Sequence, residues 1–432
     1  MAETSVRTRS PLGIVADDYT GAIDVGSVLR ELGHAVELYF GPPRGKTPPP
    51  SVDVLVVALK SRSAEAAVAV RQSLEAARWL REQGAAQLYL KYSSTFDSTD
   101  VGNIGPVMDT VTEHLRADGV AGDHPVLVCP AVPAYDRTVY QGYLFVGDRL
   151  MSEASEGRHP LTPKRDANVV RLLGRQSGRR VGLLPWQHVS RGTEAAARAL
   201  RALHEQGVDY VVADALDVSE LDTLGALARG HDLVTGAAGL AAGLMGAVDH
   251  PDVPAAAPDG DLVGVVLSGS CTEATQEQVR RFEHHRPAFH FLPTMVADGR
   301  AVVAEALEFA RANLPSGPVA ISATAPPYIV RQQQEALGRE RAARLVEDAL
   351  ADVAAGLVGF GVRKLVVAGG ETSGAVVERC GISRVTIGKS VSPGVAWVRA
   401  EEPQPVWLLL KSGPLGDRDL FTRVLVDAAG RA

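Results

Sequence analysis

The chain has 432 residues, 46% hydrophobic and 22% charged, a composition typical of a soluble globular protein with two or three domains. Its 44 basic and 51 acidic residues give a net charge of −7, which disfavours nucleic acid as a partner. Its three cysteines form no CxxC pair and its eleven histidines show no metal-ligand spacing, so a disulfide framework and a structural zinc site are both disfavoured.

The ends and the apolar stretches of the chain give no sign of a membrane partner. The most apolar long stretch, residues 235–248, is rich in Ala and Gly and is too short to span a bilayer. Residues 1–10 contain two arginines but no apolar core, so we expect a disordered tail rather than a signal peptide. With few cysteines, these features predict a cytoplasmic protein.

Short β-rich runs alternate with helical patterns along the whole chain. This alternation predicts an α/β fold of two domains, each a mostly parallel sheet flanked by helices. The strands expected in the N-terminal half are residues 12–16, 36–40, 52–59, 87–90, 126–128 and 210–213. A helix is expected over residues 64–83, because apolar residues recur there at helical spacing and Gly84 follows as a stop.

A segment without periodicity, residues 249–260, contains three prolines and is the best linker candidate. The α/β pattern restarts after it with residues 262–267. We therefore predict an N-terminal domain over residues 11–248 and a C-terminal domain over residues 261–432. The active site is expected in the cleft between the two domains.

Ligands of open α/β sheets bind at the carboxyl ends of the strands, so the residues that follow each strand are candidates for a site. Asp17 and Asp18 follow the first strand, where a carboxylate can act as a general base or bind hydroxyl groups. The alternative for either residue is a helix N-cap. Arg62 follows the third strand and could grip a carboxylate with two parallel hydrogen bonds. Its alternative is a solvated arginine beside an N-cap at Ser63.

The segment after the fourth strand is dense in hydroxyl groups. Its candidate residues are Lys91, Asp97, Ser98, Thr99 and Asn103. Hydroxyls with one carboxylate and one amide suit a polyhydroxylated ligand, and the alternative is an ordinary Ser/Thr-rich loop. Further along, residues 130–163 show little periodicity and predict a lid or a substrate loop.

Three strands of the C-terminal half lead into glycine-rich turns. The turn residues are Ser268 after the first, Gly369, Gly370, Glu371 and Thr372 after the second, and Lys411, Ser412 and Gly413 after the third. Unpaired backbone N–H groups and the helix dipole at such turns attract anions, most commonly phosphate. Lys411 could in addition neutralise charge on a phosphoryl group in transfer.

Two nucleotide motifs can be set aside. Residues 388–390 look like the end of a P-loop, but Ser383 stands where that pattern needs a glycine. No GxGxxG opens a helix, so a dinucleotide enzyme lacks support. One domain suited to a small polyhydroxy acid and another suited to phosphates describe a small-molecule kinase.

In order and content, these segments resemble the four-carbon acid sugar kinase family. The matching pieces are residues 14–22, 60–63, 91–99, 102–106, 137–140, 159–163, 368–374, 392–395 and 411–413. The resemblance covers about residues 11–425 and implies an N-terminal sugar-binding and a C-terminal nucleotide-binding domain. It implies that Asp17 or Asp18, Arg62 and residues 91–99 hold the acid sugar. It likewise implies that Ser268, Gly370 and Gly413 lie at ATP.

Within that family, residues 91–99 and 159–163 are most similar to the branch that phosphorylates the terminal 4-hydroxyl of 3-oxo-tetronates. The resemblance implies a kinase that uses ATP and Mg²⁺ on a small sugar acid, with Asp17 or Asp18 as the catalytic base. Arg62 would hold the substrate carboxylate, and Glu371 or Thr372 would lie near Mg²⁺.

Two departures from the family pattern leave alternatives open. Pro414 stands where the family has Asn and lacks a backbone N–H, and Ala238 replaces a serine and removes its hydroxyl. The alternatives are a kinase of threonate, erythronate or a branched 3-oxo acid, and a catalytically silent sugar-acid sensor on the same fold. The sequence also leaves a homodimer open.

Overall fold

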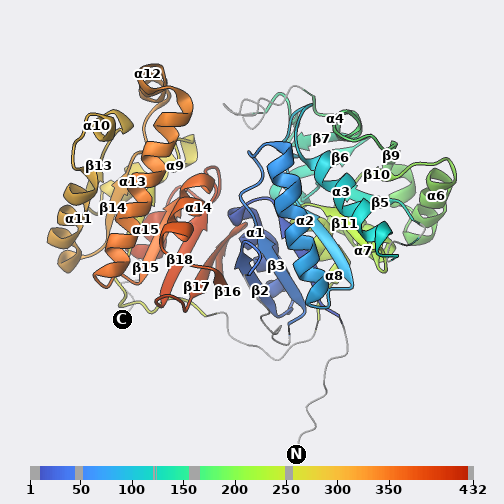
Figure 1. The fold of residues 1–432 in the computed structure, drawn as a ribbon, viewed down its shortest axis with the longest axis horizontal. Coiled ribbons are helices and arrows are strands. Elements are labelled where there is room, and N and C mark those ends of the chain that lie inside the picture. Colours follow the sequence, from blue (N-terminus) through green and yellow to red (C-terminus); the bar gives the residue numbers. More distant parts are fainter. Residues whose placement is uncertain are drawn as a thin grey trace, which may run out of the picture. The chain divides into compact units, whose positions relative to one another are not determined.

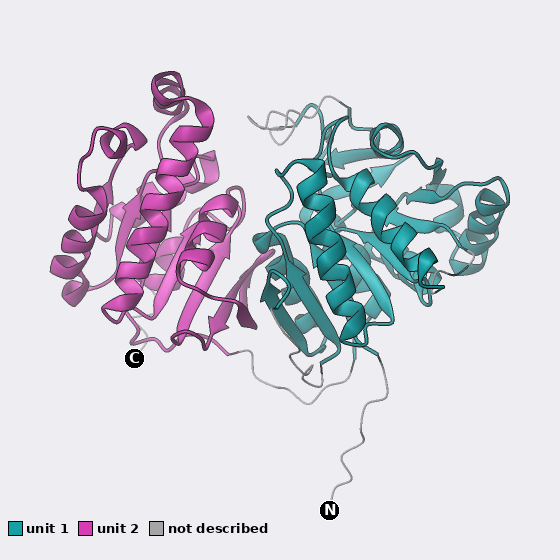
Figure 2. Ribbon diagram, in the orientation of Figure 1, with its two compact units in different colours: residues 1–253 teal, residues 254–432 magenta. Residues whose placement is uncertain are grey.

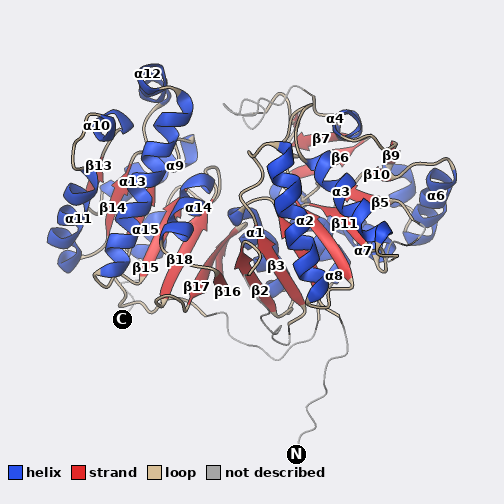
Figure 3. Ribbon diagram, in the orientation of Figure 1, coloured by secondary structure: helices blue, strands red, loops and turns tan. Residues whose placement is uncertain are grey.

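The computed structural model describes residues 10–43, 52–119, 122, 124–154, 166–248 and 256–426. The chain divides into two compact units, residues 1–253 and 254–432 (Figures 1 and 2). Each unit consists of a mostly parallel sheet with helices on its faces (Figure 3), which confirms the predicted fold class. Residues 1–9 of the predicted tail and 249–255 of the predicted linker lie outside the described residues.

The sheet of the first unit is parallel throughout and has the strand order β2-β3-β1-β4-β11-β5-β10-β9. Its strands are β1 (Leu12–Ala16), β2 (Val36–Phe40), β3 (Val54–Ala58), β4 (Gln87–Lys91), β5 (Val126–Cys129), β9 (Val181–Leu184), β10 (Tyr210–Ala213) and β11 (Leu233–Gly236). β1 and β4 are neighbours, and the chain leaves β1 toward β2 on one side but leaves β4 toward β5 on the other. That reversal of strand order is where open α/β sheets leave a crevice for ligands.

Eight helices are described in the first unit. They are α1 (Tyr19–Glu31), α2 (Ala66–Glu82), α3 (Ile104–Ala117), α4 (Val169–Gln176), α5 (Trp186–Val189), α6 (Thr193–Glu205), α7 (Val218–Ala228) and α8 (Ala238–Met245). A small antiparallel sheet of β6 (Arg137–Tyr140), β7 (Tyr143–Val146) and β8 (Arg149–Leu150) fills part of the segment predicted to be an irregular lid. Residues 155–163 of that segment lie outside the described residues.

The sheet of the second unit has the order β13-β14-β12-β15-β18-β17-β16, parallel as far as β18 and antiparallel from β18 to β16. Its strands are β12 (Val265–Ser268), β13 (Ala288–His290), β14 (Val319–Ser322), β15 (Lys364–Ala368), β16 (Arg384–Ser392), β17 (Val395–Ala400) and β18 (Val406–Lys411). The helices described with it are α9 (Glu273–Glu283), α10 (Pro293–Ala297), α11 (Val302–Asn313), α12 (Pro327–Leu337), α13 (Arg339–Gly359), α14 (Gly370–Arg379) and α15 (Leu420–Leu425).

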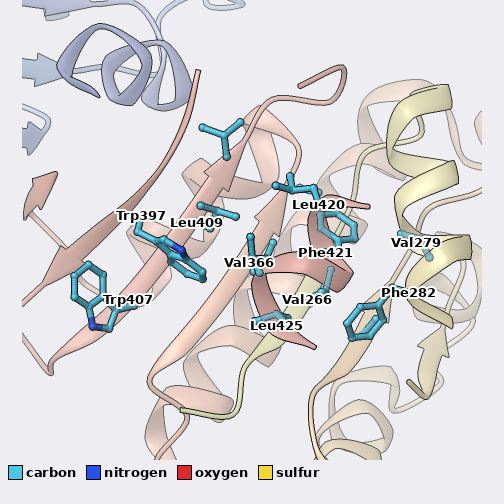
Figure 4. Close-up of a cluster of buried hydrophobic side chains, with 14 residues drawn as sticks. Val266, Val279, Phe282, Val366, Trp397, Trp407, Leu409, Leu420, Phe421 and Leu425 are labelled. Carbon is cyan, nitrogen blue, oxygen red and sulfur yellow. The ribbon is translucent and has the colours of Figure 1, made fainter. Parts of the chain in front are cut away.

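A cluster of buried side chains holds this second sheet to two of its helices (Figure 4). Phe282 of α9 and Phe421 of α15 belong to the same cluster as Val266, Val366 and Leu409 from neighbouring strands, and all five are fully buried. Burial of one such side chain stabilises a fold by about 1.5–3 kcal/mol. The cluster therefore fixes the strands whose carboxyl ends carry the glycine-rich turns.

Most predicted elements agree with the structure to within two residues. The strands at residues 12–16, 36–40 and 210–213 are confirmed, and the strand predicted at 52–59 is shorter, Val54–Ala58. The helix predicted over 64–83 runs over Ala66–Glu82, with Glu65 rather than Ser63 as its N-cap. Gly84 follows it with a φ of 90°, the left-handed conformation expected of a C-terminal stop. Among the residues placed by the structure, no helix has the length and apolar character to cross a membrane.

Candidate functional site

Polar residues predicted from the ends of three strands of the first unit lie together in the structure. Ala16 of β1 is in register with Ala58 of β3 and with Lys91 of β4, so the three strands end at one edge. The backbone of Asp17 continues the hydrogen bonding of β1 beyond the end of the strand. Its N–H donates to the Lys91 carbonyl at 3.0 Å, and its carbonyl accepts from the Arg62 N–H at 3.1 Å. Sequence-distant residues are therefore brought to the point where the strand order reverses.

Arg62 binds both aspartates of the predicted pair. Its Nε and Nη2 donate to the two carboxylate oxygens of Asp17 at 2.9 and 2.7 Å, and Nη2 also donates to Asp18 Oδ1 at 2.6 Å. The three side chains are only 16–23% exposed. The two-donor edge of the guanidinium, which the sequence suggested for a substrate carboxylate, is thus engaged by Asp17.

Asp18 is the N-cap of α1 as well as a member of this cluster. It accepts from the Gly21 N–H at 2.8 Å and from the Thr20 hydroxyl at 2.6 Å. Burial alone would raise the pKa of Asp18, but Arg62, Lys91 and these two hydrogen bonds outweigh it and lower the pKa. The capping alternative therefore describes Asp18, which is held as a carboxylate.

Asp17 and a third aspartate, Asp24, show the opposite shift. Burial raises the pKa of Asp17 even though Arg62 opposes it. Burial also raises the pKa of Asp24, which lies on α1 and accepts from the Tyr135 hydroxyl at 2.9 Å. Lys91 Nζ lies 3.7 Å from Asp24 Oδ2. Asp24 was not predicted from the sequence, because it does not directly follow a strand, whereas Tyr135 lies in the 130–163 segment predicted to be a lid or a substrate loop.

Asn103 and Lys91 are both buried beside the aspartates. The Asn103 amide donates to the carbonyls of Ser61 at 2.8 Å and Ala64 at 3.0 Å, so it holds the turn that carries Arg62. Asp17, Lys91 and Asn103 also line a small cavity in this unit, together with Ser61, Tyr92 and Thr235.

The remaining predicted substrate residues lie on the loop between β4 and α3. Gln176 of α4 donates to the Ser98 hydroxyl at 2.9 Å and to the Thr99 carbonyl at 2.6 Å, so these two residues are anchored to a helix. Asp97 is close enough to Arg62 to help raise the pKa of that guanidinium, which burial alone would lower. Gln176 was not predicted, because its contact spans 78 residues of sequence.

The three glycine-rich turns of the second unit also meet. Ser268 is in register with Ala368, and Ala368 with Lys411, so β12, β15 and β18 end side by side. Backbone bonds join the turns, with the Gly269 N–H donating to the Ala368 carbonyl at 3.0 Å and the Gly369 N–H to the Lys411 carbonyl at 2.9 Å. The predicted grouping is thus present within one unit, although the helix after the third turn begins only at Leu420.

The middle turn has the features of an anion site. Gly369 is the N-cap of α14, has a φ of 121° and provides no side-chain cap. Gly370, Glu371 and Thr372 form the first turn of this helix, whose N–H groups point out of its N-terminal end. A side chain on Gly269 would come within 2.3 Å of the Thr372 hydroxyl, so glycine is required for the close approach of the two turns. These groups fit a nucleotide phosphate.

Ser268 and Lys411 point away from solvent. The Ser268 hydroxyl is fully buried and lies 2.6 Å from that of Thr324. Lys411 is fully buried as well, and its Nζ donates to Thr275 Oγ1 at 3.0 Å, Gln278 Oε1 at 2.6 Å and the Gly413 carbonyl at 2.9 Å. Burial lowers the pKa of Lys411 to about 7. All three donor directions of its nitrogen are used inside the protein, and the expected direct contact of Lys411 with a phosphoryl group stays a prediction.

Metal ligands remain unassigned. Within the part of the chain that the structure describes, no group of three or more His, Cys, Asp or Glu side chains is arranged to hold a metal ion. The predicted contact of Glu371 or Thr372 with Mg²⁺ and the predicted location of the active site between the two domains both stay predictions.

A buried charge cluster in one α/β unit and phosphate-type turns in another define a two-domain enzyme that brings a polar small molecule to a nucleotide. Residues 12–244 match the family described as the sugar-binding N-terminal domain, and residues 265–421 match the nucleotide-binding C-terminal domain. The chain belongs to the four-carbon acid sugar kinase family.

Relatives match the chain over nearly its full length. The 3-oxo-tetronate kinase of Methylobacterium radiotolerans is 47% identical and covers 96% of this chain and 98% of its own length. That of Burkholderia multivorans is 43% identical, with 99% and 100% covered. A solved structure from Salmonella typhimurium, described as a candidate tRNA synthase, superposes with a TM-score of 0.82 at 38% identity and covers 96% of this chain and 98% of its own.

Proposed function

We propose that this protein is a 3-oxo-tetronate 4-kinase, which transfers the γ-phosphoryl group of ATP to the terminal hydroxyl of a four-carbon 3-oxo sugar acid. The observation that carries the substrate assignment is the full-length similarity to proteins named 3-oxo-tetronate kinase, at 38–47% identity. The carboxylate cluster of the first unit and the phosphate-type turns of the second supply the chemistry that such a reaction needs. The kinase name of these relatives and the net charge of −7 both favour a small-molecule substrate over tRNA.

Asp17 is the proposed general base. Its raised pKa makes it a better proton acceptor than Asp18, which Arg62, Lys91 and its cap bonds hold in the charged form. The substrate hydroxyl gives its proton to the Asp17 carboxylate while its oxygen bonds to the γ-phosphorus. The bond from that phosphorus to the bridging oxygen breaks, and ADP leaves. Arg62 orients both carboxylates, and Lys91 balances the negative charge of the cluster.

The nucleotide phosphates are proposed to lie against the turns of the second unit. The N–H groups of Gly370 and Thr372 at the start of α14 would donate to phosphate oxygens. Ser412 and Gly413 would line the adjacent turn. Mg²⁺ bound with ATP would neutralise part of the phosphate charge.

The test measures ADP release in a coupled assay that contains ATP, Mg²⁺ and one sugar acid from a panel. The panel contains D- and L-threonate, D-erythronate, their 3-oxo forms and a branched 3-oxo acid. Turnover restricted to a four-carbon 3-oxo acid supports the proposal, and turnover only with a plain tetronate or the branched acid would change the substrate. Binding of a sugar acid without ADP release would instead support the silent sensor.

A further inference from the structure

The loop after β18 is held to α9 by a set of buried side chains that neither the sequence motifs nor the reaction chemistry account for. Gln278 and Thr275 lie three residues apart on α9, so they share one face of that helix. Both are at most 1% exposed, as is Lys411 at the end of β18. Buried polar groups are costly unless they are hydrogen-bonded, and these three satisfy one another and the loop.

Gln278, Thr275 and Lys411 donate hydrogen bonds to backbone carbonyls of the loop that follows β18. Gln278 Nε2 donates to the carbonyls of Leu415 at 3.2 Å, Gly416 at 3.1 Å and Asp417 at 2.9 Å. The Gly413 carbonyl accepts from Thr275 Oγ1 at 2.9 Å and from Lys411 Nζ at 2.9 Å. Four of the five carbonyls from residue 413 to residue 417 are thus turned toward α9.

The orientation of these carbonyls decides which edge of the loop is available to a ligand. In a trans peptide the C=O points opposite to the N–H of the next residue, so the loop presents the N–H groups of residues 416, 417 and 418 as an amide edge on the side away from α9, while Pro414 contributes none. An amide edge favours anions, and a carbonyl edge repels them. The same loop contains Gly413, which the family resemblance places at ATP.

We infer that Gln278, acting with Lys411, is a positioning residue that sets the 412–417 loop for the nucleotide; this inference rests on the proposed kinase function. Gln278 needs both ends of its amide for this role, since Oε1 accepts from Lys411 at 2.6 Å while Nε2 donates to the loop. Pro414 is compatible with the arrangement, because the carbonyl before it is the one anchored twice and its fixed φ stiffens the turn.

The test compares Gln278→Glu with wild type in the full-length protein. Glutamate has nearly the same shape and still accepts from Lys411, but it cannot donate to the loop carbonyls. We expect the KM for ATP to rise by about tenfold or more, with the KM for the sugar acid within about twofold of wild type. The apparent melting temperature should fall as well, because the loop carbonyls lose a buried donor although the Lys411 contact is kept, so the comparison of the two KM values is what tests the positioning role. Gln333→Glu is the matched control: Gln333 lies on α12 in the same unit and accepts from Thr294 through Oε1, which glutamate retains.

Gln278→Met removes both contacts and should weaken ATP binding, measured by calorimetry, at least as much as Gln278→Glu does. An unchanged KM for ATP in a folded Gln278→Glu protein would overturn the inference, and so would equal rises of both KM values. Wild-type protein that neither binds nor hydrolyses ATP would instead overturn the proposed function.

Discussion

Asp17 and Asp18 both bind Arg62 but their pKa values shift in opposite directions. Burial raises the pKa of Asp17, whereas Arg62, Lys91 and the cap bonds together lower the pKa of Asp18. Asp17→Asn removes the proton acceptor, so we expect kcat to fall by about 10²–10⁴ with ATP affinity unchanged. Asp18→Asn keeps an N-cap acceptor for Gly21 and should lower kcat less. The coupled ADP assay on both variants checks this order, and full turnover by Asp17→Asn would exclude Asp17 as the base.

Asn103 was predicted to bind substrate, yet its amide nitrogen is directed to the carbonyls of the turn that carries Arg62. Asn103→Asp removes this donor and places a carboxylate against carbonyl oxygens. Loss of a buried hydrogen bond costs about 1–3 kcal/mol, so we expect lower stability and a KM for the sugar acid raised by about tenfold. Asn168→Asp is the control, because Asn168 caps α4 through its oxygen, which aspartate keeps. Equal behaviour of the two variants would contradict the role given to Asn103.

Lys411 makes stability depend on pH. Its pKa is lowered by burial from 10.5 to about 7, so between these values the unfolded chain binds the proton more tightly than the folded one. Stability should therefore rise with pH from about 7 to 10.5, by at most about 1.4 kcal/mol per pH unit, and not change through this group below pH 7. Urea unfolding at pH 7.5 and 9.5 measures the slope. Lys411→Met should have a shallower slope, and parallel slopes for the two proteins would contradict the shift.

Helices α7 and α8 pack backbone to backbone through two glycines. A methyl group on Gly243 would lie 2.1 Å from the Leu221 carbonyl oxygen, and one on Gly225 would lie 2.0 Å from the Gly243 carbonyl carbon. Gly243→Ala should therefore destabilise the fold by about 1–3 kcal/mol or more. Gly174→Ala is the control in α4, where the nearest atom lies 4.0 Å away. Alanine there should stabilise by about 0.5–1 kcal/mol in urea unfolding.

Strands such as β1 and β3 could be predicted from sequence because parallel strands buried on both faces are continuous apolar runs. Strand β11 was missed, since its four residues merge into the Ala- and Gly-rich stretch that forms α8. The sheet β6–β8 was missed because its hairpins are short and only partly buried. Elements whose burial depends on distant partners leave a weaker pattern than elements that form the centre of the sheet.

The residues of the candidate sites also fall into a group that could be predicted from the sequence and a group that could not. Asp17, Arg62 and Lys91 were found because parallel strands end at one edge, so their positions follow from the strand pattern alone. Asp24, Gln176 and Gln278 lie on helices, and their roles come from packing across 67, 78 and up to 139 residues of sequence. The positions of strand ends in the sequence do not reveal these contacts between helices and distant loops. The direction of the Lys411 side chain was equally out of reach, because it depends on acceptors that α9 supplies.

The two units should respond to different ligands. A ligand that binds only the folded state stabilises it by about 2.7 kcal/mol at a hundred times its Kd. Hydrogen exchange followed by mass spectrometry should show ATP protecting peptides that contain residues 268–275, 369–374 and 412–418. The sugar acid alone should protect residues 17–24, 61–64 and 91–103.

The hydrogen-exchange pattern distinguishes ligand binding from phosphoryl transfer. It also tests whether ATP binds the second unit and the sugar acid the first. In Asp17→Asn, ATP should still protect the second unit although turnover is lost, because the substitution lies in the first unit. The same variant with both ligands present should show both sets of protected peptides, since no phosphoryl transfer consumes them. ATP protection confined to residues 17–103 would reverse the assignment, because a nucleotide can protect only the unit whose folded form it binds.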